Sequence, residues 1–154
     1  MQQKLIDYLT ENNVLPEDSK STTRFFTIGY GGLKSFDELK DILNKNGITR
    51  LIDIRSKPYS RKWRKTDVSW NKKALQKYFG GCYIHLEEMG GLGYETNEYE
   101  RWLKIATNSI NEVIEMSKMH KVALMCAEKD PNKCHRKLFA ARTLEELGFS
   151  VYHL

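Results

Sequence analysis

Long apolar runs and cysteines are scarce in this sequence, and each shortage excludes a class of protein. No run approaches the roughly 20 apolar residues that a helix needs to span a bilayer. The opening MQQKLIDYLTENN lacks the basic head and apolar stretch of a secretory signal. The three cysteines, Cys82, Cys126 and Cys134, show no regular spacing, which favours reduced thiols over a disulfide framework. We therefore expect a cytoplasmic protein with no membrane partner.

The short motifs that usually indicate a metal or a cofactor are also missing. Structural zinc sites use close pairs such as C-x2-C, which do not occur here, and the adjacent Cys134 and His135 would rarely bind one ion. The glycine-rich stretches 29–32 and 90–93 match neither G-x-G-x-x-G nor the Walker pattern. Glycine there lets a ligand approach the backbone, and tight turns alone would also explain it. We expect no metal and no cofactor.

The pattern of apolar runs and helix signals predicts an α/β fold. Residues 1–24 read as a helical appendage that could mediate a homodimer, and residues 25–154 as a single α/β domain. Strands are expected at 25–29, 49–55, 82–88, 121–128 and 149–154. Helices are expected from Ser35 to Gly47, and at 72–79, 98–119 and 132–147. Alternating apolar strands and helices indicate a three-layer sandwich with a mostly parallel sheet of about five strands and helices on both faces.

Ligands in such folds bind beyond the carboxyl ends of the strands. Four polar clusters follow predicted strand ends, so we expect them along one edge of the sheet: residues 29–32, which include Tyr30; 53–57, which include Asp53, Arg55 and Lys57; 87–88; and 126–128.

The stretch LMCAEKDPNKCHRKLF (124–139) holds the candidate catalytic residues, Cys126, Glu128 and Cys134. Glu128 is two residues beyond Cys126, so an extended chain would point both to one side. A helix capped by Asn132 would place Cys134, His135 and Arg136 in its first turn, where amide groups favour an anion and lower the pKa of a thiol. The alternative is a packed thiol, a capped helix and a solvated arginine.

Asp53 and Arg55 alternate to the same face of the second strand. An internal ion pair would explain them, and so would a phosphate clamp formed by Arg55 with Arg136.

Positive charge is concentrated in residues 57–77, which carry +7 whereas the whole chain carries +5. Basic residues interleaved with aromatics are typical of a surface that binds single-stranded nucleic acid. The alternatives are a lid over the site or a solvated loop whose tryptophans cover the core. The candidate nucleic-acid-binding residues are Arg61, Trp63, Arg64, Lys65, Trp70, Lys72 and Lys73.

TIGYGGLKSFDELKDIL, LIDIRSKPYSRK, YIHLEEMGG, ALMCAEKDPNKCHR and LGFSVYHL together resemble the family called domain of unknown function 488, over about residues 25–154. The resemblance implies an α/β domain without an established reaction. Family members often carry Ser or Thr after the first Gly-Tyr or Gly-His, and Gly31 stands here instead. The signature positions that the resemblance implies are Asp53, Arg55, Pro58, Cys126, Glu128, Cys134, His135 and Arg136.

The sequence therefore leads us to expect an enzyme-like domain that binds a phosphate-bearing substrate, either nucleic acid or a nucleotide. Arg55 and Arg136 would hold the phosphate, and Glu128 would act as general acid or base in a hydrolysis or glycosidic cleavage. One alternative is a thiol-dependent sulfurtransferase, because LIDIRS is similar to a strand end in rhodanese-like domains, although the glycine-rich anion cradle of those domains is missing. The other is a nucleic-acid-binding module without catalysis.

Overall fold

The computed structural model describes residues 24–58, 70–128 and 135–154, and for Arg24 and residues 135–137 it describes the backbone alone. Five strands in these residues form one sheet, in the order β3-β2-β4-β1-β5, and every neighbouring pair is parallel. The α/β fold class is confirmed, with a sheet that is parallel throughout. The strands are β1 (Arg24–Gly29), β2 (Arg50–Asp53), β3 (Tyr83–His85), β4 (Val122–Cys126) and β5 (Ser150–His153).

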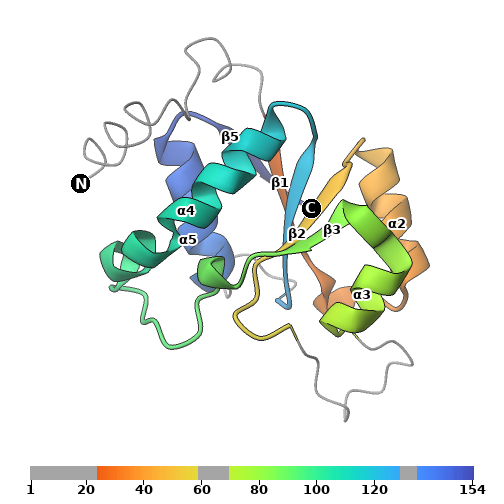
Figure 1. Cartoon of the computed structure of the whole chain (residues 1–154), viewed down its shortest axis with the longest axis horizontal. Coiled ribbons are helices and arrows are strands. Elements are labelled where there is room, and N and C mark those ends of the chain that lie inside the picture. Colours follow the sequence, from red (N-terminus) through yellow and green to blue (C-terminus); the bar gives the residue numbers. More distant parts are fainter. Residues whose placement is uncertain (1–23, 59–69, 129–134) are drawn as a thin grey trace.

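Helices cover both faces of this sheet, as Figure 1 shows. α2 (Phe36–Lys45) and α3 (Lys72–Phe79) lie on one face, and α4 (Tyr99–Ser117) and α5 (His135–Glu146) lie on the other. Three short 3-10 turns follow strands or helices: η1 (Tyr30–Gly32), η2 (Gly80–Cys82) and η3 (Glu87–Met89). None of the helices in the described ranges is long and apolar enough to cross a membrane. The predicted appendage and its role in a homodimer fall almost wholly on residues 1–23, outside the described ranges.

Local signals position the helix ends as predicted. The hydroxyl of Ser35 accepts a hydrogen bond from the Glu38 backbone N–H at 3.1 Å, and the Glu38 carboxylate accepts one from the Lys34 N–H at 2.8 Å. This capping pattern satisfies amide groups that the first turn of α2 leaves unpaired. α2 and α5 are followed by Gly47 and Gly148, whose φ angles of 68° and 96° favour glycine.

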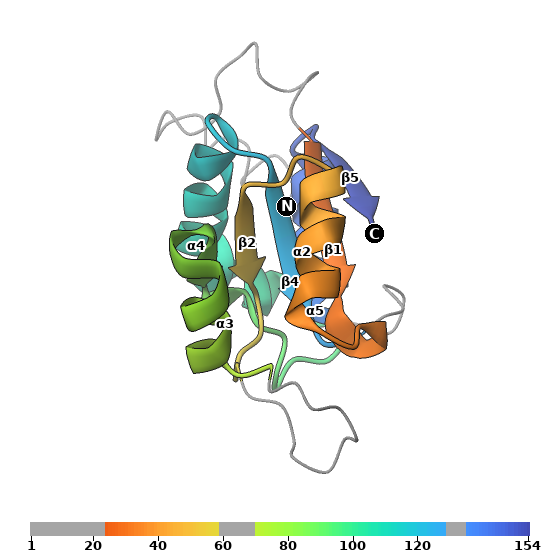
Figure 2. The ribbon, with the colours of Figure 1, turned by 90° about the vertical axis from the view of Figure 1, so that its right-hand side faces the viewer.

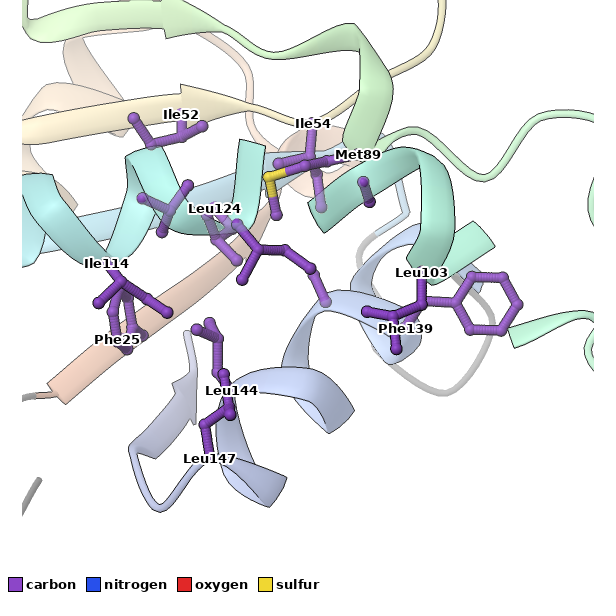
Figure 3. Close-up of a cluster of buried hydrophobic side chains, with 14 of the residues drawn as sticks. Phe25, Ile52, Ile54, Met89, Leu103, Ile114, Leu124, Phe139, Leu144 and Leu147 are labelled. Atoms are coloured by element: carbon purple, nitrogen blue, oxygen red, sulfur yellow. The ribbon is translucent and has the colours of Figure 1, made fainter. Parts of the chain in front are cut away.

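Two apolar clusters, one on each face of the sheet, form the core. The α4/α5 cluster includes Phe25, Leu124 and Leu103 (Figure 3), and the α2/α3 cluster includes Leu51 and Leu75. Successive residues of a strand face opposite clusters. In β2, Leu51 belongs to the α2/α3 cluster and Ile52 to the α4/α5 cluster. Asp53, two residues after Leu51, therefore faces the α2/α3 side of the sheet.

Four strands, β2 to β5, are shorter than predicted, and side-chain or turn geometry explains two of the early ends. β2 ends at Asp53 because the Asp53 carboxylate, rather than a neighbouring strand, accepts the Arg55 N–H at 3.1 Å. β3 ends at His85, because residues from Glu87 onward form η3. β4 ends at Cys126, two residues before the predicted end.

Candidate functional site

A buried ion pair lies at the carboxyl end of β2. Both oxygens of the Asp53 carboxylate are occupied by Arg55: Oδ1 accepts from Nε at 2.8 Å and Oδ2 accepts from Nη2 at 2.7 Å. The side chains of Asp53 and Arg55 are 0% and 2% exposed. The Tyr83 hydroxyl donates a further bond to Oδ2 at 2.5 Å. The structure therefore shows the ion pair that the sequence left as one of two explanations.

Aromatic side chains hold the other side of the Arg55 guanidinium. Nη1 donates to the Tyr30 hydroxyl at 3.0 Å, and the guanidinium carbon lies 5.0 Å from the centroid of the Tyr30 ring. Trp70 stacks on Tyr30 with a centroid separation of 4.7 Å, and Phe36 packs edge-on against Trp70 at 5.1 Å. Trp70 is only 3% exposed, so it covers the core in this conformation and does not offer a ring to a base.

The pKa shifts of this network keep its charges fixed. Burial of the Arg55 guanidinium works to lower its pKa, but hydrogen bonding and attraction to Asp53 outweigh burial and raise it. Arg55 therefore stays charged at every pH at which the protein folds. Burial, reinforced by the bond to Asp53, raises the pKa of Tyr83 and keeps its hydroxyl protonated.

Two members of the network, Tyr83 and His85, were not predicted to act at this site. Both stand on β3, which pairs with β2 so that Asp53 lies opposite His85. Tyr83 is two residues earlier and faces the same side, and the His85 Nε2 donates to the Arg55 carbonyl oxygen at 2.7 Å. The pattern of YIH predicted a strand but did not show which strand it pairs with. Tyr83 could have been placed at the site only from the pairing of β2 with β3.

Arg55 keeps two donors that no described residue accepts. A guanidinium has five N–H groups, and three of them donate to Asp53 and Tyr30. One N–H remains on Nη1 and one on Nη2. Buried donors are nearly always paired in folded proteins, so these two N–H groups are candidates for a ligand contact. The remaining N–H of Nη2 points to the outer edge of the planar group, where an oxygen of a phosphate or carboxylate could accept it together with the remaining N–H of Nη1.

Cys126 and Glu128 are separated from this network. β2 and β4 pair so that Asp53 lies opposite Met125, and Cys126, one residue later, faces the α4/α5 cluster on the other side of the sheet. Cys126 is fully buried, and its thiol donates to the Glu128 carbonyl oxygen at 3.7 Å. Glu128 is exposed. β4 ends at Cys126, so Glu128 lies beyond the strand, and its role as general acid or base stays a prediction.

The remaining predicted residues divide into described and undescribed groups. Lys57 and Lys73 are exposed, and Lys72 is half-buried at the start of α3. His135 and Arg136 lie in α5, but their side chains lie outside the description, and the predicted cap at Asn132 falls outside the described ranges. The predictions for Arg61, Trp63, Arg64, Lys65 and Cys134 fall on residues outside the described ranges.

The glycine-rich loop after β3 packs against the segment that follows Arg55. A Cβ atom at Gly90 would lie 2.4 Å from the Ser56 backbone nitrogen and 2.6 Å from its Cα. The Ser56 hydroxyl also accepts the Leu92 N–H at 3.1 Å. The space that glycine leaves at position 90 is therefore filled by the Ser56 backbone rather than by a ligand. This contact stabilises the segment that follows Arg55.

No group of three or more His, Cys, Asp and Glu side chains within the described ranges could hold a metal ion.

A cavity of about 570 Å³ lies on the α4/α5 side of the sheet, lined by residues that include Tyr99, Arg101 and Arg142. Its two arginines are already paired with Glu98 and Glu146. The cavity is separate from the Asp53–Arg55 network, whose chemistry makes that network the stronger candidate site.

Comparison with known proteins agrees with the resemblance found in the sequence. The model of one family, described as Domain of unknown function DUF488, matches residues 35–143. No curated protein and no solved structure matches the chain. The matched span includes Asp53, Arg55 and Tyr83, and it begins after Tyr30.

Proposed function

The chain belongs to the family described as Domain of unknown function DUF488, and from the geometry of its buried network we propose that it binds a phosphate-bearing ligand, a nucleic acid or a nucleotide. The site would lie at the carboxyl edge of the sheet, where β2 and its neighbour β4 end. Arg55 would be the anchor for the phosphate.

The observation that carries this proposal is the pair of N–H groups on buried Arg55 that no described residue accepts. Asp53 and Tyr30 fix the plane of the guanidinium, so its remaining edge is oriented before any ligand arrives. A preorganised group loses little conformational entropy on binding, which favours affinity. Lysine could not replace it, because a single ammonium group cannot offer two parallel N–H bonds from a rigid plane.

The charge of the site also limits its ligand. Asp53 neutralises Arg55, so a dianionic phosphate needs further positive charge nearby. Lys57 is exposed two residues beyond Arg55. The contribution expected from Arg136 stays a prediction, as does the hydrolysis or glycosidic cleavage assigned to Glu128.

No described feature favours the thiol-dependent alternative through Cys126, which is buried on the other face of the sheet. A binding module without catalysis is separated from an enzyme by Glu128→Gln. Binding that survives this change while cellular function is lost would support catalysis, and loss of neither would support a module.

The direct test follows the Arg55 side chain itself. In protein labelled with ¹⁵N-arginine, the Arg55 side-chain NMR signals should shift and saturate as inorganic phosphate or a mononucleotide is added. Signals of Arg101 and Arg142, which lie across the sheet, should move little at matched ionic strength. Arg55→Lys keeps the charge and loses the two-pronged edge, so affinity should fall at least about 10-fold, as expected for one or two charge-assisted bonds of about 1.5–3 kcal/mol.

Unfolding curves would establish that the Arg55→Lys protein is folded. If it is not, the titration of the wild-type signals decides alone. Arg55 signals that do not respond to phosphate at any concentration would refute the proposed function.

A further inference from the structure

α3 carries three lysines and no acid, unlike the other α-helices described. Lys73 and Lys77 are exposed, and Lys72 is half-buried. No salt bridge within the described ranges includes any of these three lysines. α2, α4 and α5 each contain two or more acidic residues. Within the described ranges, the outer face of α3 therefore carries positive charge that no salt bridge offsets.

This surface begins beside the Asp53–Arg55 network. The Lys72 N–H donates to the Pro58 carbonyl oxygen at 2.9 Å, which ties the first turn of α3 to the segment that leaves Arg55. Trp70, two residues before α3, stacks on Tyr30, and Tyr30 contacts Arg55. Figure 2 shows α3 alongside β2, toward the end at which the strand arrows point. A ligand anchored at Arg55 would meet α3 next.

The two exposed lysines form a line along the helix. Lys73 and Lys77 are four residues apart, which places them about 6 Å apart along the axis and about 40° around it. On one flank, Tyr78 donates its hydroxyl hydrogen to Asp37 of α2, and Asp41 lies close enough to influence Tyr78. Lys40 of α2 also lies over the Tyr78 ring, so this flank carries charge of both signs, whereas the line through Lys73 and Lys77 carries positive charge.

We propose that the ligand is single-stranded nucleic acid, with one phosphate on Arg55 and the neighbouring phosphates along Lys73 and Lys77 of α3. This inference rests on the proposed function and names single-stranded nucleic acid, rather than a mononucleotide, as the ligand. A mononucleotide ends at its anchored phosphate and gains nothing from α3, whereas a strand continues onto it. A flexible strand can also turn one phosphate toward a buried guanidinium, which the fixed backbone of a duplex does not do.

The test is a salt series of binding to a fluorescent single-stranded oligonucleotide, DNA and RNA in parallel. Lys73→Gln/Lys77→Gln removes two phosphate contacts from an exposed helix face and leaves Arg55 untouched. Each contact with a single strand contributes about 0.7 to the slope of log affinity against log salt. The slope should therefore become less steep by about 1.4, so that affinity falls about 7-fold less than in the wild type between 50 and 200 mM salt.

Lys104→Gln/Lys121→Gln is the matched control, because both lysines are exposed and lie away from α3. It makes the same change in net charge and should leave the slope unchanged. Equal slopes for the wild type and the α3 variant would overturn the inference. So would strand binding no tighter than that of a mononucleotide, no strand binding at low salt, or equally tight binding of duplex or of polyglutamate.

The ¹⁵N-arginine titration keeps the two proposals distinguishable. If phosphate shifts the Arg55 signals while the α3 variant binds the strand like the wild type, the proposed function stands and the α3 inference fails. If the strand needs the lysines while Arg55 never responds to phosphate or to the strand, the Arg55 site fails, and with it the path proposed here.

Discussion

Replacing Asp53 by asparagine should strongly destabilise the protein. The change keeps the shape of the side chain but removes the charge that compensates Arg55, whose side chain is 2% exposed. An amide group would also face two donors, the Arg55 Nη2 and the Tyr83 hydroxyl, where a carboxylate oxygen now accepts both. Removing one partner of a buried pair typically costs about 3–5 kcal/mol, because the other charge is left uncompensated.

Urea and thermal unfolding measure this cost. For a chain of this size, each kcal/mol corresponds to about 2–4 °C in Tm, so Tm should fall by about 6–20 °C. Glu98→Gln is the control, because it removes an exposed pair with Arg101 and should lower Tm far less than Asp53→Asn does. A loss below about 1 kcal/mol for Asp53→Asn would refute the reasoning.

A double-mutant cycle tests the stated cause. If the cost arises from the uncompensated charge, adding Arg55→Met to the Asp53→Asn protein should recover part of the stability. A coupling energy of at least about 1 kcal/mol is expected, within the range for residues in direct contact. Additive losses would show that the two side chains act independently.

Three shorter predictions concern the surroundings of the pair. Gly90→Ala should destabilise by about 1–3 kcal/mol, because its Cβ would collide with the Ser56 backbone, whereas Gly81→Ala, with nothing within 4 Å, should not; equal unfolding midpoints would contradict this. Tyr83 in the unfolded chain ionises near pH 10 but keeps its proton in the fold, so stability should decline above about pH 10 and Tyr83→Phe should decline less, as pH-dependent unfolding would show. The Cys126 thiol should react with iodoacetamide only as fast as the fold opens, and peptide mapping that finds rapid native labelling would place it in a reactive site.

Much of the fold was predictable because its signals are local. The Ser35 cap and the glycines that end helices act within one turn, and the alternation of apolar strands with helices indicates a parallel sheet. The order of the strands was not predictable, since the short apolar runs of β2, β3 and β4 carry nothing that selects a neighbour.

The candidate site was predictable as a region but not as a constellation. The spacing of Asp53 and Arg55 predicted that both lie on one face of the strand. Their pairing is seen only in the structure, where two hydrogen bonds join the buried side chains. Cys126 was grouped with them because it also follows a strand. The register that sets Asp53 opposite Met125 turns Cys126 to the other face, and no local pattern contains that register.

The strand order has a consequence for how the protein is made. β1 pairs with β4 and β5, and β2 pairs with β3 and β4, so within the described sheet the first two strands do not touch. A chain emerging from the ribosome can form only the β2–β3 pair of this sheet until β4 has been synthesised. Until then, both edges of β1 lack their partner strands. Closing of the sheet is therefore a late and non-local event, which is slow and exposes apolar strands to aggregation. Translation that stalls before β4 would release a chain that cannot complete its sheet, because β4 and β5 both lie in the last fifth or so of the sequence.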